Sequence, residues 1–323
     1  MKGRPRLKFA LQVIGFAVGI GLFVFALTLA LKPENREAIG HLREASQGEV
    51  VLFFTLIVAN IILNGFIFWW THCPLRGRDS ALRHWDVQAV NAIATFLAVL
   101  PFKLSIAMRF LVHIRRDKMK ATEIVSWFAA MTALTAAVLL PAAGASLLLK
   151  RIDALWITAV VVGIALCLGL GIWISLLAER VKVIRYISFG AYKVTSHWRT
   201  SLGHAMLRVI DVGLLTVRVA LVASVAGFTL GISGAILVGT TFFVMGIIAP
   251  SGQLGAREGG TMGVAALAGL EINQIALITT LLTATETMTS LVISAPSAWH
   301  LRLHRLIGKR TESKAPSQSA GTE

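Results

Sequence analysis

A turn rich in Pro and Gly interrupts the most apolar part of the chain. Residues Ala249–Glu258 read Ala-Pro-Ser-Gly-Gln-Leu-Gly-Ala-Arg-Glu, and long apolar sequence flanks them on both sides. Inside a lipid bilayer, irregular backbone leaves N–H and C=O groups unpaired, so it is tolerated only within protein or beside a water-filled cavity. Charged residues at that depth are costly and by default mark a substrate or ion path. The turn therefore indicates a transporter rather than a bundle of membrane anchors.

The composition supports a membrane location. Hydrophobic residues make up 56% of the 323 residues and charged residues only 15%, and the mean hydropathy is +0.74. A soluble chain of this length needs more polar surface, so the composition predicts an all-α, polytopic helical membrane protein. The formal charge of +15 comes from basic residues in short runs between apolar segments, which is typical of cytoplasmic loops facing an anionic leaflet. The two cysteines, Cys73 and Cys167, indicate neither a disulfide framework nor a metal site.

Apolar segments of two kinds are present. Two stretches, Ala89–Val112 and Gly231–Leu270, are broken at Pro101 and between Pro250 and Gly260. Because proline removes a helix hydrogen bond and glycine frees the backbone, each is predicted to fold as two half-helices. Six further segments are unbroken and have about the 20 residues that a helix needs to cross a membrane. These six are Phe9–Leu31, Val50–Trp70, Ser126–Leu149, Leu155–Ala178, Val209–Phe228 and Ile272–Ile293.

The positions of Lys and Arg predict an orientation. With six spans, a cytoplasmic N-terminus and both broken stretches returning to the side they left, 22 Lys and Arg fall in cytoplasmic loops and 5 in external loops. That excess fits the positive-inside rule. Ala89–Val112 then enters from the cytoplasm and Gly231–Leu270 from outside, as in inverted-repeat transporters with a site near the membrane midplane. A complete crossing by Gly231–Ala249, followed by a short return helix, is the alternative.

The turn also carries a family resemblance. Pro250–Glu258 is similar to the Pro-Gly-Gly-Leu-Gly-x-Arg-Glu signature of the lysylphosphatidylglycerol synthase transmembrane (flippase) family. Ser251 and Gln253 stand where the signature has its Pro and second Gly, although Pro250 is only one position away. The span pattern resembles that family over roughly residues 9–305.

The first broken stretch resembles the same family more weakly. Asn91 and the segment from Leu100 to Arg109 are similar to its Asn...Leu-Pro-Gly-Arg-x-Gly-Glu-x-x-Arg pattern. Lys103 keeps the positive charge and Arg109 keeps the Arg, whereas neither glycine nor the acid of the pattern is present. The resemblance implies a membrane domain that moves a lipid between leaflets. The family's synthases use a separate soluble domain for aminoacyl transfer, and because this sequence contains no counterpart of it, enzyme activity is not expected.

Eight residues are candidates for substrate binding. Arg257 and Glu258 precede a half-helix expected to begin near Gly259, where the helix N-terminus and the guanidinium both favour a phosphate. Glu258 is expected to orient Arg257 or to take a proton, and the alternative is a structural ion pair in a sharp turn. On the last span, Glu286 needs a cation or a proton, and Arg218 and Arg257 are the candidate partners. The eight residues are Lys103, Arg109, Arg218, Gly252, Gly255, Arg257, Glu258 and Glu286.

Other polar residues have simpler interpretations. Arg208 is expected to pair with Asp211, one helical turn later, and snorkelling to the cytoplasmic edge explains its position. Asn60 and Asn64 share a face of the second span and are expected to hydrogen-bond between helices. His204 lies in a basic loop and is expected to be solvated or to contact lipid headgroups, not to bind a metal.

The sequence therefore favours a lipid translocator whose cavity accepts an anionic headgroup. One alternative is a non-catalytic membrane subunit that docks a lipid-processing enzyme through the basic loop Glu179–Arg208; another is a membrane enzyme with Glu258 or Glu286 as acid or base. Membrane lipids are the expected partners, with a protein partner and an oligomer left open; no nucleic acid, metal or cofactor is expected. The expected location is the bacterial inner membrane, with residues 1–310 as one membrane domain, 311–323 as a disordered tail and both termini cytoplasmic.

Overall fold

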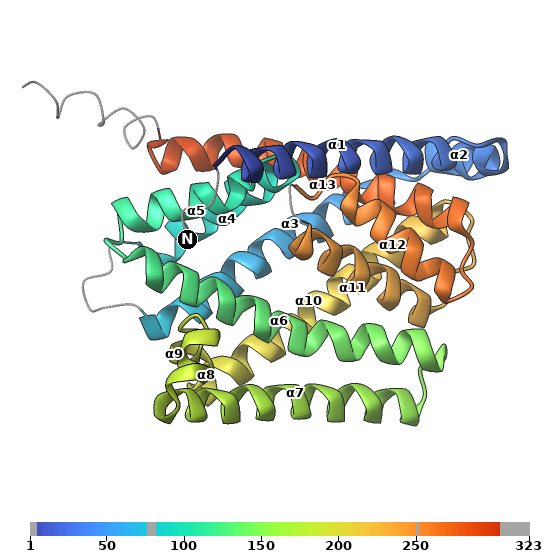
Figure 1. The fold of residues 1–323 in the computed structure, drawn as a ribbon. Helices are drawn as coiled ribbons and strands as arrows, with labels where there is room; N and C mark the ends of the chain where they lie inside the picture. Colours follow the sequence, from blue (N-terminus) through green and yellow to red (C-terminus); the bar gives the residue numbers. More distant parts are fainter. Residues whose placement is uncertain (1–4, 76–81, 250–251, 304–323) are drawn as a thin grey trace, which may run out of the picture.

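Long apolar helices dominate the computed structural model, which describes residues 5–75, 82–249 and 252–303 (Figure 1). Over those residues the secondary structure is helical and contains no strand. Five of the described helices are long and apolar enough to cross a membrane. They are α1 (Pro5–Ala30), α3 (Gln47–His72), α6 (Ala121–Leu149), α7 (Ala154–Arg180) and α13 (Ile272–His300).

The sixth segment expected to span, Val209–Phe228, lies in α10 (Trp198–Val225) except for its last three residues. α10 has 28 residues and carries Arg208, Asp211 and Arg218. The helix starts well before the predicted boundary. Its early buried residues recur at helical spacing and continue the buried face toward the N-terminus. They are Ser201, His204, Ala205 and Arg208.

The basic segment Glu179–Arg208 is consequently not a loop. It contains α8 (Lys182–Ile187), α9 (Tyr192–Thr195) and the first part of α10. His204, expected to be solvated, is fully buried there, and its Nε2 lies 3.3 Å from Thr135 Oγ1. The predicted tail 311–323 lies outside the described residues.

Both broken stretches are two separate helices, as predicted from Pro and Gly. The first consists of α4 (His84–Val99) and α5 (Leu104–Arg115). Between them Phe102 and Lys103 have positive φ angles of 66° and 53°, which reverse the chain direction. The second consists of α11 (Ile232–Ile248) and α12 (Ala256–Leu267), so the half-helix expected near Gly259 begins slightly earlier.

The two helical hairpins meet tip to tip inside the bundle. In Figure 1, α4 and α5 enter from the left of the view and α11 and α12 from the right. The backbone N–H of Gln253 donates to the carbonyl oxygen of Ala98 at 3.1 Å. A Cβ added to Gly252 would lie only 3.1 Å from the carbonyl oxygen of Leu100. The irregular backbone of each tip is therefore covered by the other, which is how such backbone is tolerated at membrane depth.

The remaining helices surround this junction. α3 packs against α10, α4 against α13, and α11 against α6, while α1 covers α12 and α13 and α7 covers α6. α12 packs along α13 and α1, whereas α5 packs mainly on α4 and touches α6 lightly. Most of α7 is exposed and apolar, as expected for a helix facing lipid.

The connections gather at the two ends of the bundle. Figure 1 shows the end of α3, the start of α4, the α5–α6 and α7–α10 connections and the end of α13 at one end. The α1–α3 connection, with η1 (Pro33–Asn35) and α2 (Arg36–Arg43), and the α6–α7 turn lie at the other. A short helix, η2 (Cys73–Leu75), follows α3.

Candidate anion-binding cavity

A cavity of about 650 Å³ lies beside the junction of the two hairpin tips. Residues of α3, α4, α5, α6, α10, α11, α12 and α13 line it, together with Gly252 and Gln253 in the turn before α12. Among the described residues that line it, the cationic ones are Lys103, Arg109, Arg208 and Arg257, and the acidic one is Glu286. The cavity wall therefore carries more positive than negative charge.

Arg109 is the cation of this wall whose surroundings most require an explanation. Only 6% of its surface is exposed. Its Nη2 donates to Asn91 Oδ1 on α4 at 2.7 Å, and its guanidinium carbon lies 3.7 Å from the centre of the Phe68 ring on α3. Asn91 is held in turn, because its Nδ2 donates to the carbonyl oxygen of Ile61 at 2.8 Å. Arg109 Nη1 has no hydrogen-bond partner among the described residues.

Neither Arg109 nor Lys103 is neutralised within the described part of the chain. The acids near the cavity pair with other arginines: Asp211 with Arg208, and Glu286 with two partners. Lys103 stands at the tip of the first hairpin and makes no ion pair in the described structure. Buried charges are normally paired or hydrogen-bonded, because desolvation is costly. The cavity thus holds positive charge without a matching carboxylate.

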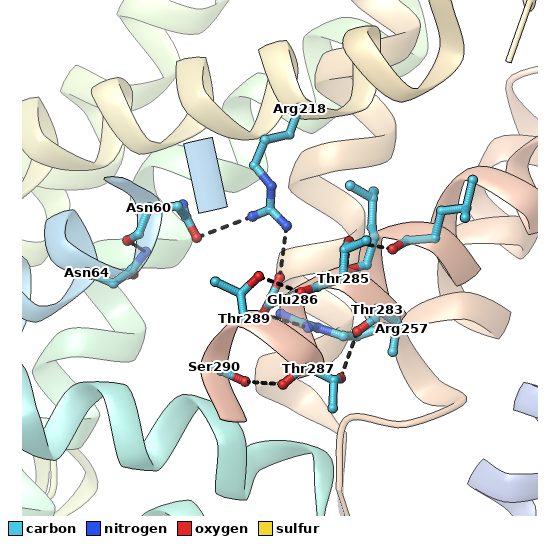
Figure 2. Close-up of polar contacts among 12 residues, drawn as sticks. Asn60, Asn64, Arg218, Arg257, Thr283, Thr285, Glu286, Thr287, Thr289 and Ser290 are labelled. Atoms are coloured by element: carbon cyan, nitrogen blue, oxygen red, sulfur yellow. Dashed lines mark hydrogen bonds and ion pairs between the residues drawn. The ribbon is translucent and has the colours of Figure 1, made fainter. Parts of the chain in front are cut away.

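Glu286 is the acid shared by two arginines. Figure 2 shows Arg218 of α10 and Arg257 of α12 directed toward it. Arg257 Nη1 lies 3.0 Å from Glu286 Oε1, and Arg218 Nη2 lies 3.2 Å from Oε2. Both arginines are buried, and Arg257 also stacks over Phe242, 4.4 Å from the ring centre. Both candidate partners of Glu286 therefore bind it.

Glu258 has a different position from the one expected. Its Oε2 accepts the backbone N–H of Gly255 at 2.7 Å, and its Oε1 accepts the hydroxyl of Thr283 on α13. It is fully buried and does not line the cavity. The residue that orients Arg257 is Glu286, while Glu258 caps the start of α12 and ties it to α13.

Gly255 permits the close approach of α12 to α1. Its φ angle is +77°, and an added Cβ would collide with the carbonyl oxygen of Gly19 on α1. A left-handed backbone at this point is easily adopted by glycine alone. The glycine therefore sets the direction in which α12 leaves the turn.

A second buried polar group lies between α3 and α10. Arg208 Nη1 lies 2.6 Å from Asp211 Oδ2, which confirms the predicted pair. Asp211 Oδ1 also accepts Asn60 Nδ2 at 2.6 Å and Asn64 Nδ2 at 2.9 Å. Arg208 is 1% exposed and lies under Phe243, so the snorkelling interpretation is wrong. Asn60 also accepts from Arg218 at 3.4 Å and so links this group to Glu286.

The eight candidates from the sequence divide into two groups. Five line the cavity: Lys103, Arg109, Gly252, Arg257 and Glu286. Three lie behind its wall and hold Glu286 and the start of α12 in place: Arg218, Gly255 and Glu258. Arg208 and Asn64 also line the cavity and are not among the eight candidates, although both interrupt apolar sequence, which is the signal that could have identified them. Comparisons with protein-family models, curated proteins and solved structures found no match to this chain.

Proposed function

We propose that this chain is a lipid translocator that moves a phospholipid or other anionic lipid between leaflets and binds its headgroup in the cavity beside the hairpin tips. The observation that carries the proposal is Arg109, a buried cation that lines this cavity without a carboxylate partner among the described residues. An anionic headgroup would supply the missing negative charge.

The chemistry of the cavity favours a phosphate or similar oxyanion. Arg109 offers its Nη1 donor, and Lys103 adds a second cation at the hairpin tip. In a medium of low dielectric constant, an ion contact of this kind is much stronger than in water. The planar guanidinium also matches the geometry of phosphate oxygens.

The apolar part of the cavity favours a lipid over a soluble anion. Ile106 on α5, Val125 on α6 and Phe189 before α9 line the cavity and are also well exposed. The rim between α5 and α6 is therefore apolar. A headgroup could reach the arginines through this side while the acyl chains stay among lipid tails.

The arrangement of the helices supports an inverted repeat with six spans. A span, a hairpin and a span occur in the order α3, α4–α5, α6 and again as α10, α11–α12, α13. Figure 1 shows the second set running in the opposite direction. The packing repeats as well, because α4 packs on α13 and α11 packs on α6. Each hairpin would re-enter the membrane from its own side, with both chain termini in the cytoplasm.

This function agrees with the resemblance to the lysylphosphatidylglycerol synthase transmembrane family. The motif residues Arg109 and Arg257, which come from different hairpins, line one cavity. On this proposal the protein is a translocator of the bacterial inner membrane and not an enzyme, and anionic membrane lipids are its ligands.

A leaflet-resolved transport assay tests the proposal. Purified full-length chain is reconstituted into vesicles containing a fluorescent phosphatidylglycerol or a fluorescent phosphatidylcholine, and a membrane-impermeant quencher reports the outer-leaflet fraction. The anionic lipid should exchange between leaflets faster in vesicles with wild-type protein than in protein-free vesicles. Arg109→Gln should lower this rate by roughly 10- to 100-fold, because a charge-assisted hydrogen bond contributes about 1.5–3 kcal/mol. Arg109→Lys keeps the charge but lacks the planar guanidinium, so its transport rate should lie between those of the wild-type protein and Arg109→Gln.

Arg43→Gln is the matched control, because Arg43 is an exposed arginine on α2, away from the cavity. It should transport at the wild-type rate. Folding is checked by the melting temperature in detergent, which Arg109→Gln should not lower, since it removes an uncompensated buried charge. A folded Arg109→Gln protein that transports at the wild-type rate would refute the assignment, as would a wild-type protein without transport activity.

A further inference from the structure

Two histidines and an aspartate converge at the end of the bundle where α3 and α5 finish. His72 is the last residue of α3, His113 lies in the last turn of α5, and Asp117 follows α5. His72 Nε2 lies 3.4 Å from Asp117 Oδ2, and His113 Nδ1 lies 3.2 Å from the same oxygen. The thioether sulfur of Met119 lies 2.9 Å from His72 Nε2. None of these residues contributes to the cavity wall.

The spacing of these atoms matches ligands around one metal ion. A charge-assisted imidazole–carboxylate hydrogen bond is usually about 2.7–2.9 Å long, so both measured separations are long for that interaction. Zinc binds imidazole nitrogen and carboxylate oxygen at about 2.0–2.2 Å, which places neighbouring tetrahedral ligands about 3.4 Å apart. The three ligand atoms lie within 4.8 Å of one another. On this geometry we propose that His72, His113 and Asp117 bind a zinc ion.

The surroundings are those of an enclosed site. The side chains of His72, His113 and Asp117 are at most 1% exposed. Both imidazoles pack against the buried ring of Trp127, with centroid distances of 5.0 and 4.9 Å. Asp117 Oδ1 accepts the backbone N–H of Leu82 at 3.2 Å, and this contact orients the carboxylate with Oδ2 toward both histidines. An orienting contact behind a metal ligand is a regular feature of zinc sites.

The ion would join segments that are far apart in the sequence. It would fix the end of α3 to the end of α5 and to the connection that precedes α6. His113 stands one helical turn after Arg109, so fixing His113 also fixes the rotation of α5 that directs Arg109 into the cavity. The site is therefore structural, and its existence does not depend on lipid transport.

Metal content of the purified protein tests the inference. The full chain is produced without a polyhistidine tag in zinc-supplemented medium, because a buried site exchanges its ion slowly. After dialysis, zinc is quantified by inductively coupled plasma mass spectrometry. Wild-type protein should retain about one zinc per chain, since His₂Asp is a familiar ligand set for this ion. His113→Ala and Asp117→Asn should each lower the ratio at least tenfold. Protein produced with cobalt should show the intense visible absorption of a four-coordinate ion.

His41→Ala is the control, because His41 on α2 is a half-exposed histidine at the other end of the bundle. It should retain zinc at the wild-type ratio. Wild-type protein that holds far less than one zinc per chain would overturn the proposal, whether or not the variants fold. So would folded His113→Ala and Asp117→Asn proteins that hold as much zinc as His41→Ala.

Discussion

The backbone N–H of Gln253 donates to the carbonyl oxygen of Ala98, and this main-chain contact joins the tips of the two helical hairpins. It satisfies polar groups that neither hairpin could satisfy with its own helices. Because only main-chain atoms take part, the contact depends on the conformation of the turns and on the glycines that permit it. It also places Arg109 and Arg257, from opposite hairpins, on one cavity.

Gly255→Ala should destabilise the protein strongly. The positive φ of Gly255 costs a residue with a side chain about 1–3 kcal/mol, and the new methyl group would also meet the carbonyl oxygen of Gly19. We expect a lower melting temperature in detergent and loss of lipid movement.

The control for this substitution is Gly263→Ala in the same helix, where an added Cβ meets no atom within 4 Å. It should be neutral or slightly stabilising, because alanine favours helix over glycine. Ala265 would be a poor control, since it is 1% exposed and belongs to the core. Equal melting temperatures for the two glycine variants would show that the turn tolerates side chains.

Glu286→Gln should lower stability more than most single substitutions. It leaves Arg218 and Arg257 buried without their shared carboxylate, and breaking a buried ion pair typically costs about 3–5 kcal/mol. Thermal unfolding in detergent measures the effect. Glu271→Gln, at an exposed position before α13, should change stability by no more than about 0.5 kcal/mol. Similar melting temperatures for both variants would mean that water or lipid solvates the two arginines.

Asp211→Asn should destabilise the contact between α3 and α10. The substitution leaves Arg208 without a carboxylate and sets an amide against the donors of Asn60 and Asn64. Adding Arg208→Gln should recover part of the loss, because no unpaired charge remains. A double-mutant cycle on the free energies of unfolding measures this coupling. Strictly additive losses would contradict the proposed pairing.

Cysteine labelling tests the orientation. Arg43 on α2 and Lys193 on α9 are both exposed and lie at opposite ends of the bundle. Each is replaced by Cys in a chain whose exposed Cys73 and Cys167 are changed to Ser. A membrane-impermeant maleimide should label Arg43→Cys in intact cells and Lys193→Cys only after permeabilisation. Labelling of both positions from one side would exclude the six-span topology.

The helix breaks were predictable from sequence, whereas one helix start was not. Pro101 and Gly255 lie at the two turns because proline and glycine act locally. The start of α10 was not predictable because the residues before Val209, among them Arg199, His204 and Arg208, are polar or charged and end the apolar run. Asn60 and Asn64 on α3 form hydrogen bonds with residues of α10. A hydropathy profile cannot predict which residues of another helix will be their partners.

The candidate site was also predictable only in part. The need of Glu286 for a cation follows from its position among apolar residues, and the structure supplies two. That Arg208 would reach the cavity, and that Glu258 would turn away from it, depends on side-chain directions set by packing. His72 and His113 lie in different helices, so no spacing motif could predict their proximity.

The unequal packing of the two hairpins has a consequence for transport. α12 lies closed against α13, while α5 stands away from α6 with the cavity between them. Under the proposed inverted repeat, α5 corresponds to α12 and α6 to α13. The same pair of helices is therefore packed together in one half and separated in the other, and we call these the closed and open arrangements. If the two halves exchanged these arrangements, α5 would pack against α6 and close the present cavity, and α12 would separate from α13 and open a corresponding cavity at the other end of the bundle. If the proposed translocation takes place, each half of the chain would therefore show the shape that its counterpart takes in the next step of the transport cycle.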